Sequence, residues 1–170
     1  MNIIFLDIDG VLNSMAYYEY NKKIGKKAKE ISDYHLQMLA KIYHSCNAKI
    51  VLSSTWRQLD CDDNVTCMKM YQYLVDELAR YDMEIISKTP VINMNRPLEI
   101  KTWLYNRMDR DEINFVSLDD DFSKDKYDEY GIGDCLIKTE FFCADMSEGG
   151  LQQKHVDEAI AILRGEYGMV

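Results

Sequence analysis

The sequence predicts one α/β domain with a doubly wound, Rossmann-like, mostly parallel five-stranded sheet, helices on both faces and no large cap domain. Short apolar runs rich in β-branched residues alternate with segments of helical periodicity along the 170 residues. Polar clusters follow several of these runs directly, as they do where ligands bind at the carboxyl ends of parallel strands. A chain of this length buries the core of one domain, so residues 1–170 are expected to form a single unit.

The composition limits the classes of function. The chain has 20 Lys and Arg against 29 Asp and Glu, a net charge of −9, which argues against a broad basic surface for nucleic acid but leaves room for a local groove. Five scattered cysteines without a C-x-x-C pair favour reduced thiols in the cytoplasm over a zinc site. We expect neither a signal peptide nor contact with a membrane, because no apolar stretch has the required length or leader.

The first strand is predicted at residues 3–6 and ends in two acids. Asp7 and Asp9 follow the apolar run, and Gly10 lets the chain turn there. Two close carboxylates repel each other, so a cation is needed, and hard carboxylate oxygens suit Mg²⁺. The alternative is that both acids merely cap a turn.

Residues 13–31 are predicted to form a loop or flap beside the end of this strand. Tyrosines and lysines interleave within residues 17–29, a pattern that stacks bases and holds phosphates. The alternative is a solvated charged loop with its tyrosines packed beneath it. A crossover helix then begins near Ser32 and continues with helical spacing to Cys46.

Hydroxyls follow the second strand, which is predicted at residues 49–52. Ser54 is the preferred contact for a substrate phosphate and Ser53 its rival, although hydroxyls also cap helices without any substrate. Arg57 is a further candidate for gripping a phosphate, and Trp56 is expected to pack.

A basic residue is expected near the site from the helix that begins at residue 96. A helix over residues 71–78 and a third strand over residues 84–87 come first. Arg96 then precedes a proline at a tolerated first-turn position, so its cation could reach inward, with Lys101 as competitor. The alternative is a surface role for either residue.

The fourth strand, residues 113–118, ends in three successive acids. Asp119, Asp120 and Asp121 repel one another strongly unless a positive group binds them, which favours a metal over an exposed acidic turn. A fifth strand over residues 135–139 and a last helix around residues 156–163 complete the prediction, with His155 on the helix surface.

Taken together, these motifs resemble the haloacid dehalogenase-like (HAD) phosphohydrolase superfamily. The resemblance depends on four motifs in order: Asp7-x-Asp9-Gly10-Val11, Ser53-Ser54, a basic residue at Arg96 or Lys101, and Asp119-Asp120. The surrounding residues, such as Leu12-Asn13 and Ser54-Thr55-Trp56-Arg57, look like the small HAD domains found in RNA repair proteins and as stand-alone chains.

The resemblance implies a mechanism and a metal. Asp7 would be the nucleophile that forms an aspartyl-phosphate, and Asp9 the general acid and base. Mg²⁺ would bind Asp7, the backbone carbonyl of Asp9 and Asp120, with Asp119 close by. Ser54 and the cation would hold the remaining phosphoryl oxygens.

The expected substrate is a phosphorylated molecule such as a nucleic acid end or a nucleotide. The missing cap would admit bulky substrates such as nucleic acid ends or phosphoproteins. A small-metabolite phosphatase is the alternative within the enzyme class. From another class, the chain could be a receiver-like signalling domain or an inactive Mg²⁺-binding interaction module. The third strand ends in Ser87-Lys88-Thr89 without an acid, which counts against the receiver.

Overall fold

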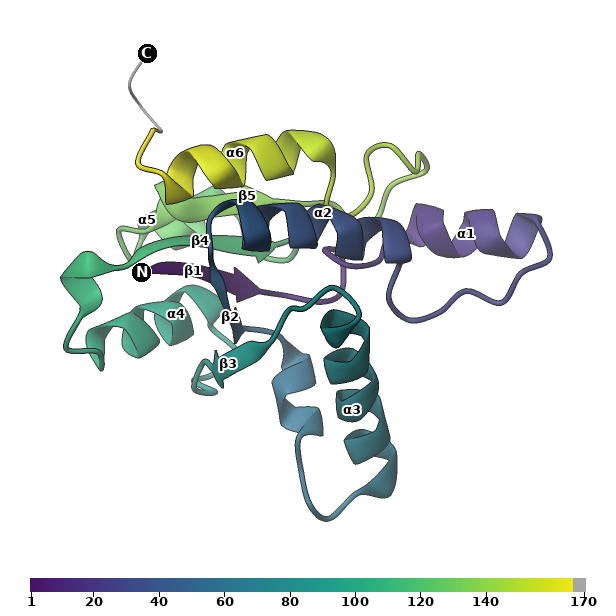
Figure 1. Ribbon diagram of the computed structural model, residues 1–170, viewed down its shortest axis with the longest axis horizontal. Coiled ribbons are helices and arrows are strands. Elements are labelled where there is room, and N and C mark those ends of the chain that lie inside the picture. The colour runs from purple at the N-terminus through teal and green to yellow at the C-terminus, as the bar shows by residue number, and fades with distance from the viewer. Residues whose placement is uncertain (167–170) are drawn as a thin grey trace.

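The computed structural model describes residues 1–166, in which five strands form one all-parallel sheet of order β3-β2-β1-β4-β5 (Figure 1). The predicted α/β fold is therefore confirmed, and all five strands lie at or within one residue of their predicted positions. The strands are β1 (Asn2–Leu6), β2 (Lys49–Leu52), β3 (Ile85–Lys88), β4 (Asn114–Asp119) and β5 (Leu136–Lys138).

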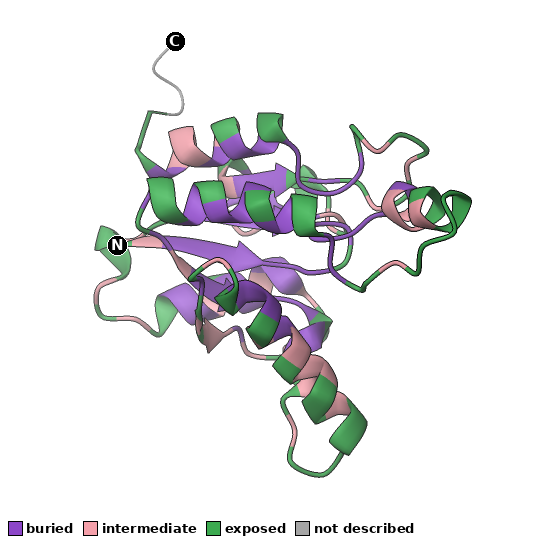
Figure 2. Cartoon of the chain, turned by 45° about the vertical axis from the view of Figure 1, so that its right-hand side comes forward, coloured by how far each residue is buried: buried purple, intermediate pink, exposed green. Residues whose placement is uncertain are grey.

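Helices cover both faces of this sheet because its side chains alternate between two apolar clusters. Ile4 and Leu6 belong to the larger cluster, together with residues of α2 (Asp33–Ser45), α3 (Val65–Ala79) and α6 (Gln153–Leu163). Ile3 and Phe5 belong to the other cluster, with residues of α4 (Arg96–Tyr105) and α5 (Lys124–Asp128). Figure 2 shows β1 between these layers, and residues 3–6 of the strand are buried.

The segment predicted as a loop contains a helix, α1 (Met15–Lys23), so the prediction was wrong for these residues. The Ser14 side chain caps it by accepting from the backbone N–H of Tyr17 at 3.2 Å, and Lys22 and Lys23 suit the negative end of its dipole. Only Ala16 of α1 is buried, which explains why the sequence has no apolar periodicity there.

His155 also departs from its predicted position on the surface. It is buried at the start of α6, where its Nδ1 accepts from the backbone N–H of Gln152 at 3.0 Å. Short 3₁₀ turns complete the chain at η1 (Thr55–Leu59), η2 (Arg110–Glu112) and η3 (Gly133–Cys135).

The sheet order places one edge of the central strand at a topological switch point. From β1 the chain proceeds to β2 and β3 on one side, and then to β4 and β5 on the other. Ligands of open α/β sheets bind outside the carboxyl ends of strands at such a point, which here lies between β1 and β4.

Candidate active site

Three acids from the ends of β1 and β4 converge at the switch point. Asp7 follows β1, and its backbone N–H donates to the carbonyl of Leu118 in β4 at 3.1 Å. One carboxylate oxygen each from Asp7, Asp119 and Asp120 lies within 4.8 Å of the others. The structure thus brings together acids more than a hundred positions apart in the sequence.

Gly10 makes room for one of these acids. Its φ of +72° is a left-handed conformation that favours glycine, and it turns the chain directly after Asp9. A Cβ atom at this position would lie 2.0 Å from the Cγ of Asp120, so a side chain here would displace that carboxylate. Position 10 therefore requires glycine for two independent reasons.

The Arg96 guanidinium lies between two of the acids. It is buried, forms an ion pair with Asp7, and places Nη1 2.8 Å from Oδ1 of Asp119. Its Nε has no hydrogen-bond partner among the described residues. Lys101, the competing candidate, is exposed and lines a separate hollow with Leu104. The structure therefore places Arg96 in the acid cluster and Lys101 outside it.

Asp119 is held from several sides. Its Oδ1 accepts from the backbone N–H of Asp121 at 2.8 Å, besides the Arg96 contact. Its Oδ2 accepts from the hydroxyl of Tyr127 at 2.7 Å, and that hydroxyl lies 2.7 Å from Oγ of Ser117. This network fixes the carboxylate at the floor of the site, where it is fully buried.

The Asp9 carboxylate is exposed but oriented by two donors. Trp56 Nε1 donates to Oδ2 at 3.0 Å, and Asn13 Nδ2 donates to Oδ1 at 2.9 Å. Asn13 is itself fixed, because its Oδ1 accepts from the backbone N–H of Gly10 at 2.9 Å. Asp9 is thus held at the solvent side of the site without being desolvated.

The two serines after β2 differ in position. The Ser54 hydroxyl accepts from the backbone N–H of Trp56 at 3.3 Å and lowers the pKa of Asp7 through a hydrogen bond. The Ser53 hydroxyl accepts instead from Thr89 at 3.4 Å, under the end of β3. Ser54 is therefore the serine coupled to the acid cluster.

The Arg57 guanidinium is buried and bonded to other residues of the protein. Only 6 % of the residue is exposed, and its Nη2 lies 2.8 Å from Oε2 of Glu99. Its Nη1 also donates to the carbonyl of Ser54 at 2.7 Å. These contacts explain the position of the side chain without a substrate phosphate.

Two carboxyl groups of the cluster have raised pKa values. Burial raises the pKa of Asp7 from 3.8 to about 6, although the Arg96 guanidinium opposes this and the neighbouring Asp119 adds to it. Burial also raises the pKa of Asp120, to about 7, helped by the negative charges of Asp7 and Asp119. Both shifts follow chiefly from burial. Neighbouring negative charges add to each pKa shift, and at Asp7 the Arg96 guanidinium outweighs the effect of Asp119.

This donor set fits a hard divalent cation. Carboxylate oxygens are the ligands that Mg²⁺ prefers, and a cation would compensate the negative charges that Asp7, Asp119 and Asp120 carry when ionised in this site. The cluster opens into a hollow of about 200 Å³. Its lining residues are Asp7, Asp9, Thr55, Arg96, Asp120, Asp121 and Phe141.

Sequence reasoning missed several supporting residues. Trp56 was expected only to pack, and Tyr127 and Phe141 were not identified at all. Trp56 and Phe141 contact segments far from them in the chain, so no local pattern indicates these two residues. Tyr127 lies in α5 and contacts Asp119 at the end of β4, a contact that depends on how the intervening turn folds. Asn13 was noted beside the first acid pair, and its spacing of four from Asp9 was the one available signal.

Comparisons with known proteins agree with this geometry. The search of curated proteins and that of solved structures found no significant match. Within residues 1–166, no helix has the length and apolar character needed to cross a membrane. Residues 3–156, however, match the family described as the HAD domain in Swiss Army Knife RNA repair proteins. The acids at the β1 and β4 ends thus belong to a HAD domain, and the chain is a member of that family.

Proposed function

We propose that this chain is a Mg²⁺-dependent phosphomonoesterase that forms an aspartyl-phosphate on Asp7. Membership of a HAD family indicates a phosphohydrolase. The observation that carries the finer proposal is the convergence of Asp7, Asp119 and Asp120 beside a hollow bordered by Asp9, with Arg96 paired to the first two. This arrangement combines a buried nucleophile, a cation and an exposed proton carrier in one place.

In the first step, a carboxylate oxygen of Asp7 attacks the phosphorus of the substrate. The new bond joins this oxygen to phosphorus while the bond from phosphorus to the leaving oxygen breaks. Asp9 gives its proton to the leaving oxygen. Trp56 and Asn13 hold Asp9 at the mouth of the hollow, where a leaving group departs toward solvent.

In the second step, Asp9 takes a proton from a water molecule whose oxygen attacks the phosphorus of the aspartyl-phosphate. The bond from phosphorus to Asp7 breaks, releasing inorganic phosphate and restoring both carboxyl groups. Arg96 and Ser54 lie next to Asp7 and bind the phosphoryl oxygens throughout.

Asp7, Asp120 and the backbone carbonyl of Asp9 would hold Mg²⁺, with Asp119 as a neighbouring acid. When bound, the metal offsets negative charge on the transferring phosphoryl group. The lining of one hollow by Asp7, Asp9 and Asp120 supports this assignment.

For the substrate class, we propose phosphorylated nucleic acid ends. The matched family is named for RNA repair proteins. The hollow beside Asp7 also favours a bulky substrate. Among the described residues, the segment that follows the acid pair forms one short helix, α1, which is too small to enclose the hollow as a cap domain would. A small-metabolite phosphatase is the competing outcome.

The test is hydrolysis of a generic aryl phosphate with Mg²⁺ and with excess chelator. We expect metal-dependent turnover in the parent and none in Asp7→Asn, while Asp125→Asn, an exposed acid on α5, retains parental activity. Metal-dependent turnover that survives in Asp7→Asn would remove this residue as the nucleophile. A second panel compares oligonucleotides carrying a terminal phosphate with mononucleotides and sugar phosphates, and equal rates would refute the preference for polymers.

A further inference from the structure

Two adjacent phenylalanines form an aromatic rim beside the catalytic hollow. Phe141 lines that hollow, whereas Phe142 is 81 % exposed. Their ring centroids lie 4.9 Å apart at an interplanar angle of 87°. The Phe141 ring also contacts Tyr18 of α1, at 6.5 Å. The aromatic rim, Phe141 and Phe142, thus extends from the mouth of the site to α1.

The backbone holds this rim in place. The carbonyl of Phe141 accepts from the N–H of Met15, the first residue of α1, at 2.9 Å, and from the N–H of Cys143 at 3.2 Å. The carbonyl of Glu140 accepts a hydrogen bond from the backbone N–H of Gly150 at 2.9 Å. Within the described residues, Phe141 supplies the ring contact of Phe142, so packing does not explain the exposed phenyl group.

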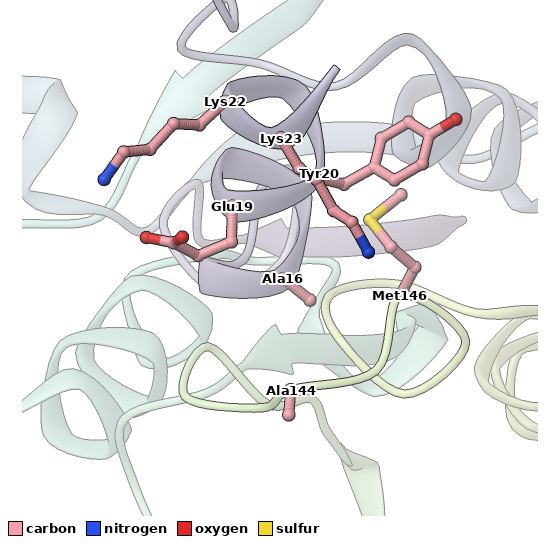
Figure 3. Close-up of a pocket in the computed structure, with 7 residues that line it drawn as sticks. All are labelled: Ala16, Glu19, Tyr20, Lys22, Lys23, Ala144 and Met146. Carbon is pink, nitrogen blue, oxygen red and sulfur yellow. The ribbon is translucent and has the colours of Figure 1, made fainter. Parts of the chain in front are cut away.

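The loop that carries the rim also forms one wall of a basic groove. This hollow of about 600 Å³ lies between α1 and the loop, next to Ala144 and Met146. Figure 3 shows Tyr20 and Lys23 extending on the side of Met146, with Lys22 on the other side of the helix. We name the basic groove by its lining residues: Ala16, Glu19, Tyr20, Lys22, Lys23, Ala144 and Met146.

The charge of this region contrasts with the rest of the chain. Residues 17–29 contain five lysines and one acid, in a protein whose net charge is −9. Lys22 and Lys23 are exposed, and no ion pair engages either of them among the described residues. A local basic surface beside an exposed aromatic ring is the chemistry that binds a single nucleic acid strand.

We propose that the rim and the groove together bind a single-stranded nucleic acid end. The terminal phosphate lies in the catalytic hollow, the base of the terminal nucleotide stacks on Phe142, and the adjoining backbone phosphates approach Lys22 and Lys23. This inference rests on the proposed function, since it places the reacting phosphate at Asp7. It deepens that function by assigning the residues that select the polymer.

The experiment measures binding separately from turnover. A labelled single-stranded oligonucleotide with a terminal phosphate is titrated into the Asp7→Asn protein, with Phe142→Ala or Phe142→Trp added. We expect Phe142→Ala to weaken binding roughly 5- to 100-fold, the usual range for one stacked base, and Phe142→Trp to preserve it. An otherwise identical probe whose terminal nucleotide lacks its base should bind weakly to the Asp7→Asn protein, with or without Phe142→Ala.

Matched control variants separate the binding roles of Phe142, Lys22 and Lys23 from the general effect of removing an exposed ring or charge. Tyr105→Ala removes another highly exposed aromatic, at the end of α4, and should leave binding unchanged. Lys22→Ala with Lys23→Ala should reduce the salt dependence of binding, whereas Lys69→Ala with Lys154→Ala, exposed lysines of α3 and α6, should not.

Unchanged affinity of the Phe142→Ala protein for the complete probe, relative to its Asp7→Asn parent, would overturn the proposal. Equal affinity of that parent for the complete and base-free probes would also overturn it. Equally tight binding of a phosphopeptide would overturn it too, because a peptide offers neither a base nor a phosphate backbone. Absence of hydrolysis in the parent, with the expected binding pattern intact, would instead refute the proposed function.

Discussion

Asp7→Asn should stabilise the metal-free protein in a pH-dependent way. The pKa of Asp7 is about 6 in the folded protein and 3.8 as its ordinary value, because burial disfavours the ionised form. The folded state therefore binds more protons than the unfolded state between these values, so the contribution of Asp7 to stability falls as pH rises from about 4 to about 6.

The magnitude follows from the two pKa values. At pH 8 ionised Asp7 lowers the free energy of unfolding by about 3 kcal/mol relative to a group that stays neutral, and at pH 4.5 by about 1 kcal/mol. Asparagine is neutral in both states, so the substitution should be more stabilising at pH 8 than at pH 4.5 by about 2 kcal/mol. The substitution also removes hydrogen bonds of Asp7, and this loss cancels when its effects on the free energy of unfolding at the two pH values are subtracted.

The assay is urea unfolding of the parent and Asp7→Asn in chelator at both pH values. Asp125→Asn, which removes an exposed acid of α5, serves as control and should change the free energy of unfolding little. A pH-independent effect of Asp7→Asn, or a larger gain at pH 4.5, would refute the reasoning that Asp7 is forced to ionise in a desolvated site.

Three further substitutions test the surroundings of the acids. Gly10→Ala should lose about 1–2 kcal/mol of unfolding free energy and bind Mg²⁺ more weakly in calorimetry, because the new Cβ collides with Asp120. Trp56→Phe should lower kcat roughly ten-fold with little change in KM, because it removes a donor to Asp9; an unchanged kcat would contradict this. Arg57→Ala should cost about 3–5 kcal/mol in denaturant unfolding by leaving a buried carboxylate unpaired. A large KM increase in stably folded Arg57→Ala would instead favour substrate contact.

The sequence was sufficient to predict the sheet because each strand is a short apolar run ended by polar residues. Such runs bury both faces in a parallel sheet, and the flanking polar residues mark where each strand stops. Helix α1 was not predictable in this way, since only Ala16 is buried and its stability depends on Ser14 and the loop against it. Amphipathic patterning detects helices only when they bury a stripe of side chains.

The acids of the site were predictable because they follow strands directly, but their partners were not. Arg96 and Lys101 fit the sequence pattern equally well. Five positions along a helix correspond to about 140° around its axis, so the two side chains of α4 face different directions. Only the packing of α4 against the sheet decides which one meets Asp7, and here it is Arg96.

The most direct test of the central claim is detection of a phosphoryl group on Asp7. Asp9→Asn should still be phosphorylated by an aryl phosphate, whose leaving group departs without a proton donor, but should hydrolyse the intermediate slowly because no base activates water. Rapid quenching and peptide mass spectrometry should then find one phosphoryl group on Asp7, labile to hydroxylamine and missing when Asp7→Asn is added. Steady turnover by the parent, with no such adduct on Asp7 in the Asp9→Asn protein, would contradict the account.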